Sequence, residues 1–277
     1  MTILSFEFFP PNTPAGLEKL RATREALDAL EPAFYSVTFG AGGSTREKTL
    51  GVVAQIAEAG RAVAPHLSCI GATKASIGEL LDDYRARGIR RLVALRGDLP
   101  SGMVDHGEFR YANELIGYIR AHSGDWFHIE VAAYPEMHPQ APSPAHDLDN
   151  FLRKVDAGAD SAITQYFFNA AAYFDFVARV RARGIDIPIV PGIMPITNFT
   201  QLARFSDTCG AEIPRWIRLR LAGFGDDTAS IKAFGHEVVT ALVDELVAAG
   251  VPGIHFYTLN QAGPSAEIWR AVRQSGR

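Results

Sequence analysis

The sequence is poor in cysteine, with only Cys69 and Cys209 among 277 residues. The two cysteines lie far apart in the chain and form neither a CxxC pair nor a zinc-binding spacing. A disulfide-stabilised scaffold and a zinc module are therefore both excluded. We expect two buried free thiols in a reducing compartment.

Long apolar runs and clusters of like charge are also missing. No segment is long and apolar enough to span a membrane, and the N-terminus lacks the basic start and apolar stretch of a signal peptide. The 27 Lys and Arg residues against 31 Asp and Glu residues give a formal net charge of −4, without the basic footprint of a nucleic-acid-binding protein. We therefore expect a cytoplasmic protein that binds neither membranes nor nucleic acids.

What the sequence does contain is a regular alternation of apolar, β-rich runs and amphipathic segments. Hydrophobic residues make up 47% of the chain and charged residues 21%, which is typical of a globular protein with a substantial core. Helical spacing of apolar residues is clear at 17–30, 49–60, 77–88 and 230–250, and no linker interrupts the pattern. The expected strands are residues 3–9, 34–40, 62–70, 90–97, 128–135, 161–168, 187–194 and 253–260.

Eight apolar strands alternating with helices favour a single α/β domain over residues 1–277, folded as a (β/α)₈ TIM barrel. The alternative is an open doubly wound sheet, which usually carries a GxGxxG motif in its first strand-to-helix turn. The nearest match, residues 40–45, lacks the third glycine and follows the second expected strand. We therefore predict the closed barrel.

Nearly every expected strand ends in a polar or otherwise special residue. In (β/α)₈ barrels the active site lies at the C-terminal ends of the strands, so this pattern predicts a ligand site at that rim. The spacing of His138 and His146 matches no standard metal site, and we expect no metal. The rim residues are Glu7, Thr38, His66, Ser68, Arg96, Asp98, Tyr134, Glu136, His138, Gln165, Pro191, Gly192, Tyr257 and Asn260.

One further segment, residues 147–158, carries four polar side chains at helical spacing. Asp147, Asn150, Arg153 and Lys154 fall on one face if this segment is a helix. They could form an ordinary solvated face, or a clamp in which the cations hold phosphates while the acid and the amide bind hydroxyls. The spacing alone leaves both interpretations open.

A resemblance to the 5,10-methylenetetrahydrofolate reductase family is carried by eight segments in order: SFEFFPP, APHLSCIGAT, ALRGDLP, AAYPEMHP, RKVDAGAD, ITQYFF, PGIMPITNF and HFYTLN. The similarity runs over about residues 5–260. It implies a (β/α)₈ flavoprotein in which NADH or NADPH reduces FAD, and the flavin then reduces 5,10-methylenetetrahydrofolate to 5-methyltetrahydrofolate. The chain resembles the short bacterial form of the family, which consists of the catalytic barrel alone.

The resemblance also implies which residues bind the cofactor and the substrates, and it favours the clamp interpretation of the helix. One position departs from the family: the motif YTLNR reads YTLNQ here, with Gln261 in place of an arginine near the folate. The implied FAD contacts are Thr38, Phe39, Ala41, His66, Arg96, Gly97, Asp98, Tyr111, Ala112, Ala132, Tyr134, His138, Asp147, Asn150, Arg153 and Lys154. The implied substrate contacts are Glu7, Asp98, Gln165, Gln201, Phe205, Tyr257 and Gln261.

Glu7 and Asp98 are the catalytic residues that the resemblance implies. Opening the methylene bridge of the folate needs a proton on the departing ring nitrogen. An apolar setting between Phe6 and Phe8 would raise the pKa of the Glu7 carboxyl, which would make Glu7 the general acid. Asp98 would accept hydrogen bonds from the pterin, and its charge would disfavour the anionic reduced flavin.

Other functions remain open at this stage. A proline-dehydrogenase-type flavin barrel has no evident use for the acid in SFEFFPP, and a flavin-free lyase or aldolase needs a strand-end Schiff-base lysine or metal triad that is not found. A non-catalytic folate- or flavin-binding protein is a third possibility. We also expect a homo-oligomer, and kinetics in which nicotinamide and folate take turns at one site.

Overall fold

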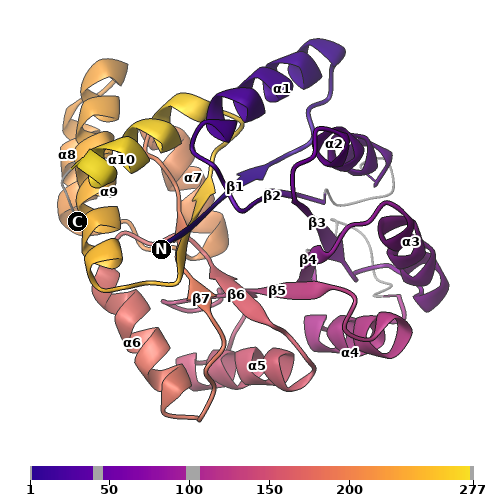
Figure 1. The fold of residues 1–277 in the computed structure, drawn as a ribbon. Coiled ribbons are helices and arrows are strands. Elements are labelled where there is room, and N and C mark those ends of the chain that lie inside the picture. Colours follow the sequence, from indigo (N-terminus) through magenta and orange to yellow (C-terminus); the bar gives the residue numbers. More distant parts are fainter. Residues whose placement is uncertain (1, 40–45, 98–106, 275–277) are drawn as a thin grey trace.

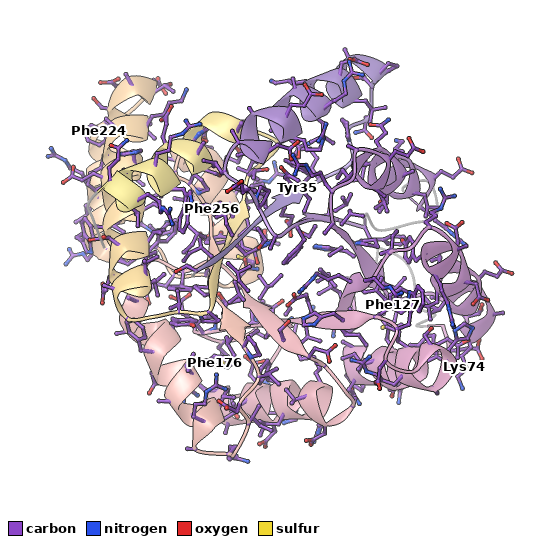
Figure 2. All side chains as sticks on the ribbon, in the orientation of Figure 1. Tyr35, Lys74, Phe127, Phe176, Phe224 and Phe256 are labelled. Atoms are coloured by element: carbon purple, nitrogen blue, oxygen red, sulfur yellow. The ribbon has the colours of Figure 1, made fainter. Side chains whose placement is uncertain are left out.

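The structure, a computed structural model, describes residues 2–39, 46–97 and 107–274. Parallel strands form a central barrel, and helices surround it (Figure 1). The α/β barrel predicted from the sequence is thus confirmed. Figure 2 shows that large apolar side chains such as Phe127 and Phe176 lie between the helices and the strands.

The strands follow one another around the barrel in sequence order, and every pairing is parallel. The seventh strand is divided at Pro191: its first half pairs with the sixth strand, and its second half pairs with the last. The nine segments therefore correspond to the eight expected strands. They are β1 (Ile3–Phe8), β2 (Phe34–Val37), β3 (Val63–Ser68), β4 (Arg91–Leu95), β5 (His128–Ala133), β6 (Ser161–Thr164), β7 (Ile189–Val190), β8 (Gly192–Ile193) and β9 (Gly253–Tyr257).

Polar residues begin most of the helices. The side chains of Thr13, Thr73, Ser143 and Asn198 each accept a hydrogen bond from a backbone N–H of the first helical turn, which satisfies a group that the helix itself leaves unpaired. The helices are α1 (Pro14–Asp28), α2 (Arg46–Glu58), α3 (Lys74–Ala86), α4 (Ala112–Ser123), α5 (Pro144–Asp156), α6 (Ala170–Arg181), α7 (Phe199–Cys209), α8 (Arg215–Gly223), α9 (Thr228–Ala248) and α10 (Ala262–Gln274).

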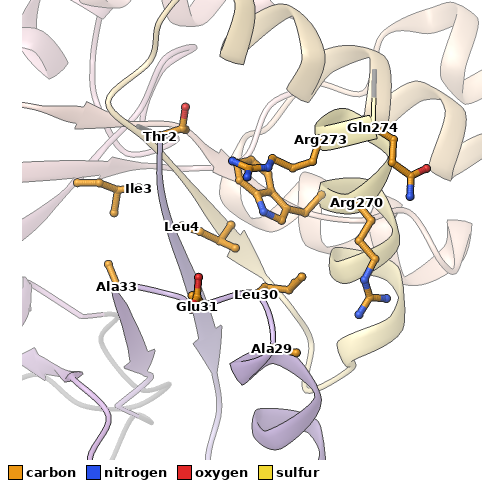
Figure 3. A pocket seen from close by; sticks show the side chains of 11 residues that line it. Thr2, Ile3, Leu4, Ala29, Leu30, Glu31, Ala33, Arg270, Arg273 and Gln274 are labelled. Carbon is orange, nitrogen blue, oxygen red and sulfur yellow. The ribbon is translucent and has the colours of Figure 1, made fainter. Parts of the chain in front are cut away.

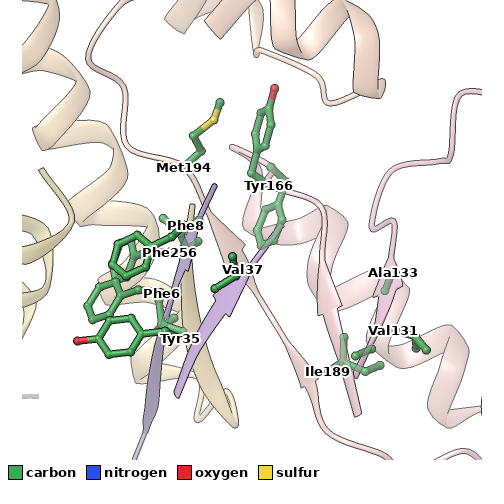
Figure 4. Packing of buried hydrophobic residues seen from close by; sticks show 14 of the residues in the cluster. Phe6, Phe8, Tyr35, Val37, Val131, Ala133, Tyr166, Ile189, Met194 and Phe256 are labelled. Atoms are coloured by element: carbon green, nitrogen blue, oxygen red, sulfur yellow. The ribbon is translucent and has the colours of Figure 1, made fainter. Parts of the chain in front are cut away.

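Successive side chains of β1 point alternately to the apolar core outside the barrel and to the barrel interior. Phe6 and Phe8 point outward and stack on Tyr35, with ring centroids 6.1 and 5.2 Å apart, and Phe6 also stacks on Phe256 at 5.9 Å (Figure 4). Because successive side chains of a strand point to opposite faces, Glu7 points into the barrel. The carboxylate is therefore not enclosed by the two phenylalanines that flank it in the sequence.

Both cysteines are free thiols, but only Cys69 is fully buried, whereas Cys209 is half-buried. The expectation of two buried thiols is therefore right for Cys69 and wrong for Cys209. Within the described ranges, none of the helices combines the length and the apolar character needed to cross a bilayer.

Candidate active site

Two cavities adjoin at the C-terminal end of the barrel, and Tyr134 lines both of them. The first, which we call the mouth, has a volume of about 280 Å³ and opens over the barrel interior. The second, which we call the side cleft, has a volume of about 450 Å³ and lies between the β5–α5 segment, α5 and the start of α4. The mouth is lined by both apolar and polar side chains, whereas the side cleft carries the cations Arg96, Arg153 and Lys154.

Glu7 lies on the floor of the mouth beside two histidines from other strands. One of its carboxylate oxygens is 3.3 Å from Nε2 of His66 and 3.8 Å from Nε2 of His255. Ser5 Oγ lies 2.8 Å from Nδ1 of His255, which fixes that ring. Nε2 of His255 is buried and forms no hydrogen bond among the described residues, with the Glu7 carboxylate 3.8 Å away.

This arrangement corrects the expected protonation of Glu7. Burial acts to raise the pKa of its carboxyl, but the imidazoles of His255 and His66 outweigh burial and lower the pKa to about 2. The carboxylate is therefore ionised in the absence of a ligand. The prediction of a raised pKa was wrong because it rested on Phe6 and Phe8, whose rings lie on the other face of β1.

The end of β1 is tied to the segment that follows β9, and this holds Glu7 in place. Thr258 Oγ1 donates a hydrogen bond to the backbone oxygen of Glu7 at 2.6 Å. The Asn260 side chain bonds both the N–H and the C=O of Phe9, at 3.0 and 2.8 Å. Asn260 and Leu259 adopt positive φ angles of 55° and 49°, a costly conformation that these contacts maintain.

Tyr257, Gln165 and Phe205 also line the mouth, and Tyr257 lies on β9 directly beside Glu7 in the strand register. The Tyr257 hydroxyl donates to the backbone oxygen of Thr164 at 2.7 Å, which holds the phenol ring across the barrel. Only glycine fits at 192, because a Cβ there would lie 2.1 Å from the Thr164 oxygen and 2.6 Å from the Tyr257 ring. Phe205 remains 37% exposed and offers a flat apolar surface at the rim.

The side cleft is lined by cations. Lys154 donates from Nζ to the backbone oxygen of Ala132 at 2.5 Å, and burial lowers the pKa of its ammonium group to about 8, although Asp147 acts in the opposite direction. In the part of the chain that the structure describes, no carboxylate lies within ion-pair distance of Lys154. An unpaired, largely buried cation that faces a cleft is well suited to an anionic ligand.

Other contacts shape the cleft. The Asp147 carboxylate accepts a hydrogen bond from the backbone N–H of His138 at 2.9 Å, which joins the β5–α5 segment to α5. The Tyr134 and His138 rings meet edge to face at 4.5 Å, and the Arg96 guanidinium donates to the Gln140 side chain. The structure thus brings strand-end groups and one face of α5 to a common space.

The mouth and the cleft contain most of the predicted site residues. Thr38, Phe39 and Gly97 lie at the strand-end rim without lining either cavity, and Ala41 and Asp98 lie outside the described residues. Predicted residues in the mouth are Glu7, His66, Ala132, Tyr134, Gln165, Phe205 and Tyr257. Those in the cleft are Arg96, Tyr111, Ala112, Tyr134, His138, Asp147, Asn150, Arg153 and Lys154.

Gln201 and Gln261 are exposed and line neither cavity. Gln201 lies one helical turn before Phe205 on α7, and Gln261 lies two residues after Leu259, which does line the mouth. Both are therefore near the rim, within reach of a ligand that extends out of the mouth.

Sequence reasoning missed His255 in the mouth and Asn113 and Gln140 in the cleft. A signal for His255 was present, because it lies two residues before Tyr257 on one strand and so shares its face. No such periodicity marks Asn113 or Gln140, which lie outside the strands.

A further cavity of about 520 Å³ lies at the opposite end of the barrel, beside the start of β1 (Figure 3). Arg270 and Arg273 of α10 border it together with Glu31 and Trp269. The N-terminal end of such a barrel usually serves stability rather than catalysis. Across the described ranges, no group of three or more His, Cys, Asp or Glu side chains could hold a metal ion.

The fold and the position of the site define the class of this protein: a parallel α/β barrel with its ligand site at the C-terminal ends of the strands. Comparison with known sequences identifies the particular group within that class. A sequence model described as methylenetetrahydrofolate reductase matches residues 1–273. The chain belongs to the methylenetetrahydrofolate reductase family.

Individual relatives agree with this assignment. A protein of Salmonella typhimurium named 5,10-methylenetetrahydrofolate reductase is 43% identical over 266 residues, which cover 96% of this chain and 88% of the relative. The Escherichia coli protein of the same name is 42% identical with the same coverage. An Arabidopsis thaliana protein named methylenetetrahydrofolate reductase (NADH) 1 is 37% identical; the match covers 94% of this chain but 46% of that protein.

Solved structures share the fold at much lower sequence identity. A Clostridium thermocellum protein, described as binding two copies of 5-methyl-5,6,7,8-tetrahydrofolic acid, superposes with a TM-score of 0.67 at 16% identity, covering 98% of this chain and 93% of that one. An oxaloacetate acetylhydrolase superposes with a TM-score of 0.54 at 12% identity, covering 99% and 80%. These likenesses support the barrel fold alone.

Proposed function

We propose that this chain reduces 5,10-methylenetetrahydrofolate to 5-methyltetrahydrofolate with NADH or NADPH, and that it uses FAD to do so. Membership of the methylenetetrahydrofolate reductase family supports the reaction. The observation that carries the proposal is the continuity of the site: Glu7 in the mouth and Lys154 in the side cleft belong to cavities that meet at Tyr134. Such a site suits a long ligand with a ring at one end and an anion along its length.

The cleft residues fit FAD in their chemistry. Lys154, Arg153 and Arg96 supply positive charge for a diphosphate, and Asp147 and Asn150 supply acceptors for hydroxyl groups. FAD, when bound, supplies the hydride-transfer chemistry that no side chain can provide. The protein's own contribution is to bind the ligands, to orient them and to transfer one proton to the folate.

We assign this proton transfer to Glu7, which lies beside His66 and His255. Because the pKa of Glu7 is lowered to about 2, its carboxylate is ionised and must take up a proton before it can give one to the folate. Nε2 of His66 lies 3.3 Å from that carboxylate, in position to relay a proton. Glu7 is the most exposed of the three, with 19% of its side chain accessible against 9% for His66 and 1% for His255. We infer that Glu7 passes a proton to the departing ring nitrogen and that the imidazoles replace it.

The residues that line the mouth favour alternating substrates. Gln165, Phe205 and Glu7 line one cavity, so a nicotinamide and a pterin that both contact them would compete for one place. The nicotinamide and the pterin would then occupy the same place in turn. This gives ping-pong kinetics.

The proposal is tested with the purified protein. It should be yellow, release FAD and not FMN on denaturation, and oxidise reduced nicotinamide when 5,10-methylenetetrahydrofolate is added. A colourless protein that FAD does not reconstitute would refute the cofactor assignment. Turnover with menadione but not with the folate would retain a flavin oxidoreductase and refute the folate reaction.

A further inference from the structure

A buried serine of β2 has no hydrogen-bond partner among the described residues. The side chain of Ser36 is fully buried, and its Oγ forms no hydrogen bond with any described group. Buried hydroxyl groups are nearly always hydrogen-bonded, because leaving one unpaired costs free energy. The Ser36 hydroxyl therefore needs a partner other than the residues that the structure describes.

The strand register places Ser36 beside Glu7, inside the barrel. The two residues are partners in the pairing of β1 with β2. Tyr35 points outward, where its ring stacks on Phe6 and Phe8 (Figure 4). Since side chains alternate along a strand, Ser36 points to the opposite face, as Glu7 does. Neighbouring strands lie about 4.8 Å apart, which is close enough for one water molecule to contact both side chains.

A second unpartnered polar atom lies near the same carboxylate. Nε2 of His255 is buried, forms no hydrogen bond among the described residues and lies 3.8 Å from the Glu7 oxygen. That distance is too long for a direct hydrogen bond and suits a contact completed by water. Nδ1 of the same ring is already engaged, 2.8 Å from Ser5 Oγ. Ser36 and His255 thus lie beside Glu7 on the two strands that flank β1.

We propose that one buried water molecule binds between Ser36 Oγ, Nε2 of His255 and the Glu7 carboxylate, and that Ser36 positions this water for proton transfer to Glu7. Three polar partners are typical of a buried water. Glu7 and His255 both line the mouth, which gives the water a route of entry. The role of Ser36 in proton delivery rests on the function proposed above, whereas the water site itself does not.

The proton path is balanced at each step. Glu7 protonates the departing ring nitrogen, whose bond to the methylene carbon then breaks with its electron pair left on the nitrogen. The water gives one proton to the Glu7 carboxylate and takes one from Nε2–H of the His255 imidazolium. Solvent returns that proton to His255 when the mouth is empty, and Ser36 neither gains nor loses one. The other titratable groups beside Glu7 are His66 on β3 and Tyr257 on β9.

The first test shows whether Ser36 has a partner, and it needs no turnover. Ser36→Ala in the FAD-loaded protein should leave the urea midpoint unchanged or lower it, because the hydroxyl loses a bound water. Ser265→Ala is the matched control. Ser265 on α10 is equally buried and also lacks a partner among the described residues, so its replacement should raise the midpoint, helped by the helix propensity of alanine.

A high-resolution crystal structure of the wild type completes this test. It should show a water molecule within hydrogen-bond distance of Ser36 Oγ. The absence of that water, or a midpoint for Ser36→Ala raised as much as that for Ser265→Ala, would overturn the proposal.

The second test measures the two half-reactions by rapid mixing. Ser36→Ala should slow the folate-dependent half by about 3- to 10-fold, the kinetic equivalent of one hydrogen bond, and leave the nicotinamide-dependent half unchanged. Ser36→Thr keeps the hydroxyl and should restore most of the folate-dependent rate. In mixtures of H₂O and D₂O, the wild-type folate half should respond as a transfer of two protons, and Ser36→Ala as a transfer of one.

The outcomes separate this inference from the proposed function. An unchanged folate-dependent rate and isotope response in Ser36→Ala would overturn the role of Ser36 in proton delivery, even where Glu7→Gln blocks folate reduction. A wild type that does not reduce the folate would instead refute the proposed function, and the first test would still decide the water site.

Discussion

A carboxylate oxygen of Glu7 lies 3.3 Å from Nε2 of His66, inside the mouth of the barrel. With His255 close by at 3.8 Å, the cluster keeps an acidic side chain ionised where burial alone would favour its neutral form. The strands β1, β3 and β9 bring these residues together from distant parts of the sequence. The cluster has consequences for stability as well as for catalysis.

Stability should depend on the ionisation of Glu7. Its pKa is lowered from 4.5 to about 2 in the folded protein, so the ionised carboxylate stabilises the fold above about pH 4.5, and this contribution is lost as the pH falls towards 2. The full contribution is of the order of 3 kcal/mol. The difference in unfolding free energy between wild type and Glu7→Gln should therefore shrink as the pH is lowered from 6 to 3.

Urea unfolding at several pH values measures this difference. Glu79→Gln, at an exposed position of α3, is the matched control and should run parallel to the wild type. A Glu7→Gln curve that also runs parallel to the wild type would show that the carboxylate has no lowered pKa.

FAD affinity should fall as the pH rises from 7 to 9. The pKa of Lys154 is about 8 without an anion, and a bound diphosphate would raise it, so binding takes up a proton in this range and weakens by up to tenfold per pH unit. Lys154→Arg keeps the charge at all these pH values and should bind FAD with little pH dependence. Titration calorimetry in two buffers measures the proton uptake directly. The same pH dependence in both proteins would assign the proton to another group.

Gly192→Ala should destabilise the protein by about 2 kcal/mol or more, because the added methyl group would overlap the Thr164 oxygen and the Tyr257 ring. It should also weaken folate binding, since Tyr257 lines the mouth. Gly117→Ala is the matched control: nothing lies within 4 Å of its added Cβ on α4, and it should stabilise the protein by about 0.5–1 kcal/mol. Similar denaturation midpoints for the two variants would contradict this packing argument.

Gln261→Arg should tighten folate binding and leave reduction of the bound flavin by nicotinamide unchanged. Gln261 is exposed just beyond the mouth, where an arginine could reach the carboxylates of a folate tail. Gln261→Glu, its charge-reversed counterpart, should weaken binding. Equal folate dissociation constants for all three proteins would place residue 261 out of reach of the ligand.

The sequence predicted the elements that local patterns encode. Apolar runs located all eight barrel strands, and Pro191 marked the division of the seventh. Helical spacing placed Asp147, Asn150, Arg153 and Lys154 on one face, and the structure confirms that all four line the side cleft. Helix α8 was not expected, because nine residues with alternating arginines give a weak periodic signal.

Electrostatics could not be predicted in the same way. The pKa of Glu7 depends on His66 and His255, which no local pattern connects to it. Its sequence neighbours Phe6 and Phe8 suggested an apolar environment. Because side chains alternate along a strand, both rings lie on the opposite face of β1 from the Glu7 carboxylate. Residue contacts across a barrel require the register of several strands, and a single sequence does not provide that register.

The central claim, that Glu7 supplies the proton for folate reduction, is tested most directly by separating the two halves of the reaction in Glu7→Gln. Glutamine keeps the size of the side chain and its hydrogen-bonding capacity but cannot transfer the proton. Rapid mixing should show oxidation of reduced nicotinamide by the FAD-loaded variant at a rate close to that of the wild type. The folate-dependent half should be slower by about 10²–10⁴-fold, although the folate still binds. A folate-dependent rate close to that of the wild type would contradict the claim and leave Glu7 with a structural role.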